Sequence, residues 1–323
     1  MKLDKLDYKI LEELDYNARI PQSELAKKLN LSKQNISYRI NKLIKNKIIQ
    51  AFITGINMHK LGYLTYRIYL RININKSKEI IDYFKNLNNT LWVVSLSGMW
   101  DLEVVILAKN YIELNNIVKK SKEDLGIYFT KINISTSIFN YQFKRDYLLN
   151  KERKLFIPFY YGFEPKKEDL DELDIKILYE LSKDCNRSNQ EIGKKLKTTY
   201  HTIKQRINKM EKLKIIIHHR IFINLEKINR KFYKATITLN NSTKEKEKEL
   251  YNFCSSFNFI VYLVEVLGDW QLEIEAEVES QNQFNDFLIQ LRKKFPDLIQ
   301  DYQIIQATKE HKIDFFPGNI KLT

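Results

Sequence analysis

The chain has few of the residues on which small-molecule chemistry usually depends. Cysteine occurs only twice in 323 residues, at Cys185 and Cys254, and there is no CxxC pair. This excludes a disulfide scaffold and gives no support to a zinc site, so we expect both thiols to be buried packing residues. The eight glycines are scattered and form neither GxGxxG nor GxxxxGK[ST], the loops that bind nucleotide phosphates.

Long apolar runs and catalytic motifs are also absent. No uncharged run of about 18 apolar residues occurs, and the first residues, MKLDKLDYK, lack the apolar region of a secretion signal. We therefore expect a cytoplasmic protein without membrane contact. Neither HExxH nor GxSxG occurs. The sequence thus predicts no catalytic residue, no metal, no cofactor and no enzyme activity.

Positive charge is what the chain has in excess. Lysine and arginine number 54 against 40 acidic residues, which gives a formal net charge of +14. Such a balance favours an anionic partner, either nucleic acid or a membrane surface. No helical pattern offers a long apolar face for a bilayer, so nucleic acid is the better expectation. The length predicts two to four modules.

The most informative segment is residues 32–47, SKQNISYRINKLIKNK. Its apolar residues Ile36, Ile40 and Leu43 recur at helical spacing, and Ser32 suits the N-cap. No acidic residue occurs from position 33 to 50. A short helical pattern over residues 23–29 precedes it, with room only for a tight turn between. This order predicts a helix-turn-helix unit.

The first turns of a recognition helix usually meet base edges, while its cations meet phosphates. On that basis we expect double-stranded DNA to contact eight residues of this segment. They are Ser32, Lys33, Gln34, Asn35, Ser37, Tyr38, Arg39 and Lys42. The alternative is that the helix is only a solvated basic face.

Alternating and helical patterns follow the predicted first head, which we place at residues 1–54. Strand patterns at 63–74, 91–96, 102–108 and 128–139 alternate with helical patterns at 77–87 and 111–124. The order βαββαβ predicts an α+β, ferredoxin-like sensor domain over residues 55–147, with one sheet and two helices on one side. Residues 148–170 then read as an aromatic connector that packs against a neighbouring domain.

The plan then restarts. Residues 173–178, LDIKIL, repeat residues 6–11, LDYKIL, at an offset of 167, and RINK occurs at both 39–42 and 206–209. In the sensor region the offset becomes 170, which pairs Gly98 with Gly268 and Trp100 with Trp270. The chain is therefore predicted to be a tandem duplication, with a second winged helix-turn-helix at 171–224 and a second sensor domain at 225–323.

Each half resembles the Lrp/AsnC (feast/famine) family of transcription regulators, and tandem fused forms look most like archaeal members. The matching stretches are LDYKILEELDYNARIPQSELAKKLNLSKQNISYRINKL and WVVSLSGMWDLEVVILAK. The resemblance implies a DNA-binding head, a sensor domain that pairs through its sheet, and often an effector such as an amino acid. It implies an internal pseudo-dimer here, with further homo-oligomers left open.

In the family the effector lies near a GxxD turn. The resemblance therefore assigns an effector to the two hairpin turns of this chain, with the alternative that Gly98 only makes the turn and Asp101 only caps it. The residues concerned are Gly98, Met99, Trp100, Asp101, Gly268 and Trp270. Gln271 stands where Asp101 stands in the first half, so the two turns are expected to differ. The usual glycine after the recognition helix is absent, and we expect the helix to end through Asn46.

The second head is expected to bind DNA as well. The alternative is that it has kept its fold and lost the ability to recognise bases. Its predicted contacts share the same helix positions as those of the first head. They are Tyr200, His201, Thr202, Lys204, Gln205, Arg206 and Lys209. Because the two sets differ, the preferred DNA site should be asymmetric.

Two other functions remain open at this level. Siroheme decarboxylases look like Lrp/AsnC proteins and also occur as fused pairs, but none of the five histidines lies in the sensor hairpins, and the adjacent His218 and His219 would point to opposite faces of a strand. An architectural protein that coats DNA would use the same basic helices. The reading that fits best is a sequence-specific DNA-binding transcription regulator.

Overall fold

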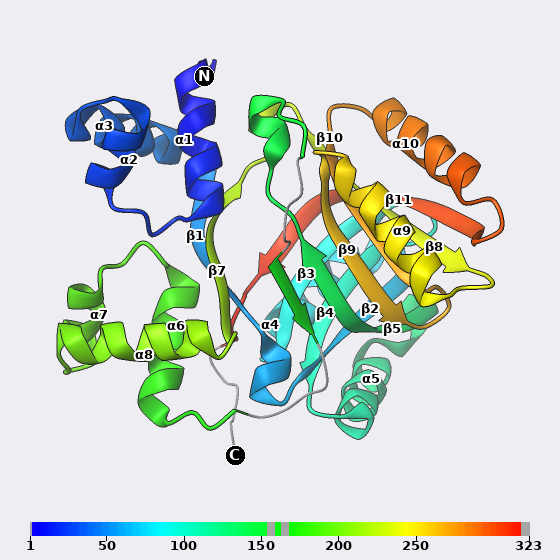
Figure 1. Cartoon of the computed structure of the whole chain (residues 1–323). Helices are drawn as coiled ribbons and strands as arrows, with labels where there is room; N and C mark the ends of the chain where they lie inside the picture. The colour runs from blue at the N-terminus through cyan, green and yellow to red at the C-terminus, as the bar shows by residue number, and fades with distance from the viewer. Residues whose placement is uncertain (1, 154–158, 163–167, 318–323) are drawn as a thin grey trace.

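The computed structural model describes residues 2–153, 159–162 and 168–317, and the fold below refers to these residues. Each half begins with three helices that form a head. The first head contains α1 (Lys5–Tyr16), α2 (Gln22–Leu29) and α3 (Lys33–Lys45), and the second contains α6 (Glu172–Lys183), α7 (Asn189–Lys195) and α8 (Tyr200–Lys212). Figure 1 shows both heads on the same side of the sheet structure, with α3 in the upper head and α8 in the lower one.

The same capping device starts the first helix of both heads. The side chain of Asp4 accepts the backbone N–H of Asp7, whose side chain in turn accepts the N–H of Asp4, and Asp171 and Asp174 repeat this box. Each box satisfies two donors that a helix start leaves free. The duplicated LD motif of the sequence is therefore a duplicated helix start.

A two-stranded ribbon joins the heads. β1 (Ile49–Ile56) pairs antiparallel with β7 (Ile216–Ile223), so each head pairs its strand with that of the other head. The exchange is almost symmetric, because Ala18 N–H donates to the carbonyl of His219 and Cys185 N–H donates to that of Phe52. Cys185 and Cys254 are both buried, as predicted. The ribbon makes the two heads one body.

Each half then continues into four strands and two helices. In the first half these are β2 (Leu64–Ile72), α4 (Ser77–Asn86), β3 (Thr90–Ser97), β4 (Leu102–Ala108), α5 (Tyr111–Leu125) and β5 (Phe129–Gln142). In the second half they are β8 (Lys231–Leu239), α9 (Lys244–Ser256), β9 (Ile260–Leu267), β10 (Leu272–Val278), α10 (Gln281–Lys294) and β11 (Ile299–Ile313). Short 3-10 turns are η1 (Met58–Leu61), η2 (Ile74–Lys76), η3 (Gly126–Tyr128), η4 (Asp146–Leu149) and η5 (Glu226–Ile228).

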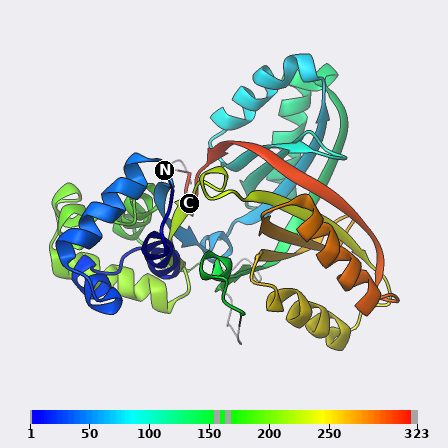
Figure 2. The same ribbon diagram turned by 90° about the horizontal axis from the view of Figure 1, so that it is seen from above.

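The two sheets are fused into one closed ring, which the sequence did not predict. The strand order is β2-β4-β3-β11-β8-β10-β9-β5, and β5 also pairs with β2. Two sets of pairs join the halves, β3 with β11 and β5 with β9. Figure 2 shows α4 and α5 on one flank of this ring and α9 and α10 on the opposite flank. The expected single sheet per half is thus half of a barrel, because edge strands satisfy their backbone groups across the two halves.

Part of the aromatic connector joins this ring. β6 (Phe159–Gly162) pairs with β5, and the Phe159 ring meets the His218 ring edge-on at 5.1 Å between centroids. The expected packing of the connector is borne out at these residues. Phe156 and Phe163, which we also assigned to it, lie outside the described residues.

Two absences hold within the described ranges. No helix among these residues combines the length and apolar character that a bilayer crossing needs. No group of three or more His, Cys, Asp or Glu side chains in the same ranges is arranged to hold a metal ion.

Candidate nucleic-acid interface

Helix α3 presents most of its predicted DNA contacts to solvent. Its buried face consists of Ile36, Ile40 and Leu43, and Ser32 caps its start by accepting the N–H of Asn35 at 3.1 Å. The exposed residues on the other side include Lys33, Gln34, Asn35 and Tyr38, while Ser37, Arg39 and Lys42 are half-buried. The exposed polar face of α3 is free to enter a DNA groove. The assigned DNA contacts stay a prediction.

Arg39 is the exception, because its guanidinium already has partners inside the head. Its Nη1 lies 2.8 Å from Asp4 and 2.7 Å from Asp7, and its Nε donates to the side chain of Asn35 at 3.1 Å. The hydrogen bond that Arg39 donates to Asp4 raises the pKa of Arg39. Arg39 therefore ties α3 to the capping box of α1, and we expect it to position Asn35 rather than to read a base.

Helix α8 repeats this arrangement with different side chains. Thr199 caps it, and Ile203, Ile207 and Met210 form its buried face. The exposed predicted contacts are Tyr200, His201, Lys204, Gln205 and Lys209, with Thr202 and Arg206 half-buried. Arg206 Nη1 lies 2.5 Å from Asp171 and 3.1 Å from Asp174, so it has the same tie to α6 that Arg39 has to α1.

The recognition helices end on lysines in the left-handed region. Lys47 and Lys214 both have φ of +57°, the conformation in which glycine is usual, whereas Asn46 keeps a negative φ and donates its side-chain N–H to the carbonyl of Lys42. Our expectation that the helix ends through Asn46 is correct for the cap. The left-handed residue that turns the chain away from the helix is Lys47, one residue later.

The predicted effector turns are largely engaged by the protein. Trp100 and Trp270 point into the barrel and are 2% and 5% exposed, with the Tyr69 ring between them at 6.0 and 5.1 Å. Gly98 has φ of +130°, and a Cβ there would lie 2.9 Å from the carbonyl oxygen of Ile304. Met99 is 39% exposed. The turn therefore needs glycine for its backbone and for its contact with the opposite half.

Asp101 and Gln271 do the same structural work. Asp101 accepts the backbone N–H of Ile72 at 3.0 Å and an Arg71 N–H at 2.8 Å, and Gln271 accepts the N–H of Leu239 at 2.9 Å. Leu239 is the repeat equivalent of Ile72. This favours the capping alternative for Asp101. Asp269, at the neighbouring position, accepts from Asn133 at 2.5 Å. Gly268 lies against Ser135 of the first half.

A layer of buried charge lies next to the aromatic end of the barrel. Arg67 Nη1 lies 2.8 to 3.1 Å from Glu103, Glu273 and Glu275, and Lys234 Nζ reaches Glu103 at 2.7 Å. Burial raises the pKa of Glu103 despite the charges of Lys234 and Arg67. The repeat pairs Arg67 with Lys234 and Glu103 with Glu273, so both halves supply a cation and an acid. This layer could not be predicted from the sequence, because an isolated charged residue within a strand pattern does not indicate which charge it will face.

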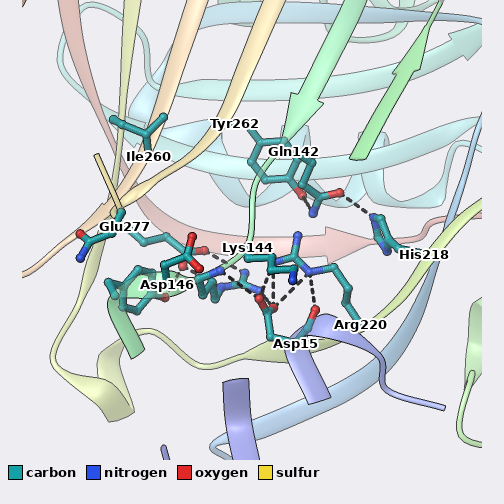
Figure 3. A network of polar contacts seen from close by, with 12 residues as sticks. Asp15, Gln142, Lys144, Asp146, His218, Arg220, Ile260, Tyr262 and Glu277 are labelled. Carbon is teal, nitrogen blue, oxygen red and sulfur yellow. Dashed lines mark hydrogen bonds and ion pairs between the residues drawn. The ribbon is translucent and has the colours of Figure 1, made fainter. Parts of the chain in front are cut away.

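A second charged network lies where the first head meets the barrel, and Figure 3 shows it from close by. Asp15, at the end of α1, accepts from Arg220 of the ribbon at 2.7 Å and from Arg145 at 2.6 Å. Arg145 also donates to Glu277 of β10 at 2.7 Å, as does the hydroxyl of Tyr147. Burial alone would raise the pKa of Asp15, but the charges of Arg220 and Arg145 lower it to about 2. Four segments far apart in sequence thus meet in one network around two carboxylates.

Beside this network, a cavity of about 780 Å³ separates the ribbon from the mouth of the barrel. Its wall includes side chains of the ribbon and of the barrel strands. Those that carry the argument below are His218, Arg220, Glu275, Glu277, Trp92 and Phe232. A volume of this order matches common small-molecule sites. Nothing in the order of residues along the chain had placed these groups together.

Both heads match models of helix-turn-helix families. Residues 3–50 match a winged helix-turn-helix DNA-binding domain, and residues 170–211 match an AsnC-type helix-turn-helix domain. Two relatives are uncharacterised HTH-type transcriptional regulators. One, of Pyrococcus furiosus, is 31% identical over 145 residues, and one of Pyrococcus horikoshii is 32% identical over 145 residues. Each match covers 45% of this chain and 98% of the relative.

A comparison of folds finds a similar solved structure over nearly the whole chain. The siroheme decarboxylase NirDL is similar with a TM-score of 0.65 at 12% identity, over 96% of this chain and 94% of that one. The same enzyme in complex with an iron-uroporphyrin III analogue gives 0.66 at 12% identity, over 98% and 95%. This likeness concerns the fold.

The relatives span about half of this chain, which agrees with two family units in sequence. The matched residues are those of the heads and recognition helices described above. The chain belongs to the Lrp/AsnC family of transcription regulators.

Proposed function

We propose that this protein is a cytoplasmic transcription regulator that binds an asymmetric, two-part site on double-stranded DNA. We also infer that it carries two complete head-and-sensor units, with the sensor units paired inside one chain. The observation that carries this proposal is the pair of exposed basic helices, α3 and α8, held in one body by the exchanged β1–β7 ribbon.

A fixed pair of helices suits two successive major grooves, whose centres lie about 34 Å apart. The ribbon limits relative movement of the heads, and Arg19 adds a further link by donating to the carbonyl of Cys185 at 2.6 Å and to the side chain of Asn189 at 2.6 Å. Such a rigid pair should demand a fixed spacing between its half-sites. Inserting five base pairs between them should abolish high-affinity binding, because one helix then faces the wrong side of the duplex.

The two halves of the site should differ in base preference. Gln34 and Asn35 carry amides that suit adenine, whereas His201 and Thr202 occupy the equivalent positions in α8. Exposed cations such as Lys33, Lys204 and Lys209 suit phosphates. If about six such contacts form, log K should fall against log salt with a slope near −5.

Selection of bound fragments from random DNA at near-physiological salt tests this proposal. An enriched asymmetric site is the expected result. Asn35→Ala should then cost about 1 to 3 kcal/mol at one half-site, and Thr202→Ala should affect only the other. Tight, salt-sensitive binding without enrichment would instead indicate an architectural protein, and equal half-sites would contradict the asymmetry.

The proposal includes an amino-acid effector that binds at the hairpin turns, because the family resemblance implies one. The same selection with and without an amino-acid pool tests it, because a shift of the selected site would name the effector. The engaged side chains of Asp101 and Gln271 leave chiefly backbone groups and Met99 for such a ligand.

Tetrapyrrole chemistry is the second candidate, and the whole-chain fold similarity together with the cavity is what favours it. Most cations of the wall are already engaged and are not free for the carboxylates of a tetrapyrrole. The arginines Arg67, Arg145, Arg220 and Arg230 are already paired with carboxylates of this chain. A shift of the Soret band of siroheme on addition of the full chain, and its loss with Arg220→Ala, would support this candidate. Unchanged absorbance would remove it.

A further inference from the structure

The cavity between the ribbon and the barrel mouth differs between the two halves in a way that packing does not require. Four of its polar wall residues have apolar counterparts in the other half of the repeat. His218, Arg220, Glu275 and Glu277 correspond to Ala51, Ile53, Val105 and Leu107. Burial of polar groups costs free energy that apolar side chains avoid. The equivalent positions of the first half are apolar, so the fold as such does not require polar groups at them.

One wall residue has an acceptor that the protein leaves unused. His218 is 7% exposed, its Nε2 lies 2.6 Å from Gln142 Oε1, and Nδ1 has no hydrogen-bond partner. Gln142 donates to the Tyr262 hydroxyl at 2.5 Å, which fixes its oxygen toward His218. Burial, aided by the charge of Arg220, lowers the pKa of His218 well below its usual value, so the ring is neutral. Nε2 then carries the proton, and the buried Nδ1 keeps a lone pair without a partner, which a ligand reaches only if the ring turns or shifts toward it.

The carboxylates of the wall point to the same kind of ligand. Glu275 bonds to Arg67 through Oε1 at 2.9 Å, and its Oε2 has no hydrogen bond within the part of the chain that the structure describes. The arginines of the wall are paired with acids of this chain, as described above. These acids include Asp15, Glu277 and the buried acids Glu103, Glu273 and Glu275. Glu275 also lies 3.3 Å from Lys234 through the same Oε1, so its charge is compensated there, and the group it leaves for a ligand is the acceptor Oε2. That oxygen can accept a hydrogen bond from a donor or a cation and would repel an anion.

The rest of the wall supplies the shape. Trp92, Tyr161, Phe232 and Tyr262 bring aromatic rings to the cavity, and Ile221 adds an apolar contact. Residues such as Gln50, Glu226 and Lys231 are exposed and line the rim, so the space is open to solvent. Flat apolar bodies pack well against such rings, and cations gain further from their faces.

We propose that this cavity is a binding site for an aromatic organic amine, whose charged or N–H-bearing head meets Glu275 and His218 and whose ring lies among the aromatic residues of the wall. The site is separate from the hairpin turns at the far end of the barrel. It does not depend on the DNA-binding function, because binding can be measured on the free protein.

Three probes with one ring system and different heads test the proposal by calorimetry on the full chain. They are tryptamine, tryptophol and indole-3-propionate, which are cationic, neutral and anionic at pH 7. The expected order of affinity is tryptamine, then tryptophol, with indole-3-propionate weakest. Glu275→Gln, which keeps the shape, should weaken tryptamine about 10-fold and leave tryptophol within about 2-fold.

Controls keep the result decisive. Glu249→Gln, on the exposed face of α9 and away from the cavity, should change none of the affinities. If Glu275→Gln does not fold, His218→Phe gives the second comparison and should weaken tryptamine and tryptophol together, because both lose the Nδ1 acceptor. Equal binding of all three probes, preference for the anion, or binding of none of them would overturn the proposal.

Discussion

The two junctions between a head and the barrel differ in the kind of side chain that forms them, charged in one and apolar in the other. At the first head, Asp15, Arg145, Arg220 and Glu277 form a buried ionic junction. At the second head, the equivalent positions are Ser182, Phe315, Ile53 and Leu107, and a continuous apolar cluster there includes Leu107, Phe316 and Leu181. One ancestral contact has thus become ionic on one side and apolar on the other.

The apolar junction shows that the fold does not need the ionic one. Replacing a buried ion pair by well-packed apolar residues is often neutral or stabilising, whereas removing a single partner is costly. The attachment of the first head is therefore sensitive to the loss of a single charged group, whereas the attachment of the second head is not. Both junctions border the cavity, the ionic one through Arg220 and Glu277 and the apolar one through Ile53 and Phe315.

Asp15→Asn should break the ionic junction most severely. Arg220 and Arg145 would lose the carboxylate that both of them face, and the expected loss is about 3 to 5 kcal/mol in the free energy of unfolding. Urea denaturation followed by circular dichroism measures it. Ser182→Ala is the matched control at the apolar junction, where only a bond to the carbonyl of Tyr179 is lost. A change below about 1 kcal/mol in Asp15→Asn would show that the junction carries little stability.

Leu107→Ala should break the apolar junction by a different mechanism. Its side chain is fully buried, so its removal leaves a cavity and should cost about 2 to 5 kcal/mol. Because no charge is involved, the loss should be the same at pH 3 and pH 7 and at low and high salt. A pH-dependent loss, measured by the same denaturation, would mean that the junctions are not of different kinds.

Acid should separate the junctions without any mutation. The pKa of Asp15 is lowered in the folded state to about 2 from an ordinary 3.8, so its contribution is complete above pH 3.8 and disappears as the pH falls through 2. This corresponds to about 2 kcal/mol. Comparing the wild type with Asp15→Asn from pH 5 to pH 2 should show the stability difference shrinking. A constant difference would assign the acid sensitivity to other carboxylates.

The smallest expected effect concerns a feature that both heads share. Lys47→Gly and Lys214→Gly should each stabilise the protein by up to about 1 kcal/mol, because a φ of +57° strains lysine and suits glycine. Thermal unfolding should show equal gains at the two sites. Unequal gains would reveal that one helix end is under a constraint that the backbone angle does not show.

The sequence predicted the repeated parts of this molecule well. Helical spacing located α2, α3, α4 and α5, and alternation located the strands of the first sensor unit to within a few residues. These signals are local, since they depend on which face of a single element is apolar. The family and the helix-turn-helix units are confirmed by the comparisons.

What the sequence did not reveal depends on pairing between distant segments. The exchanged ribbon, the closure of the barrel and the meeting of Asp15 with Arg220 join residues that are 120 or more positions apart, and no periodicity encodes such a choice. The sequence also left open whether Asp101 contacts an effector or caps the turn. Its partners Ile72 and Arg71 lie on another strand, so the contact could not be predicted. The DNA contacts themselves stay predictions.

Closure of the barrel has a consequence for how the chain is made. The first sensor unit has β3 and β5 at its edges, and their partners β11 and β9 belong to the second. While the ribosome is still producing the second half, both edges of the first sheet stand open, and unpaired edges invite association with other chains. Residue 313, at the end of β11, must emerge before the last edge is covered. Nascent chains of this protein should therefore depend on chaperones or rapid translation more than single-unit relatives do.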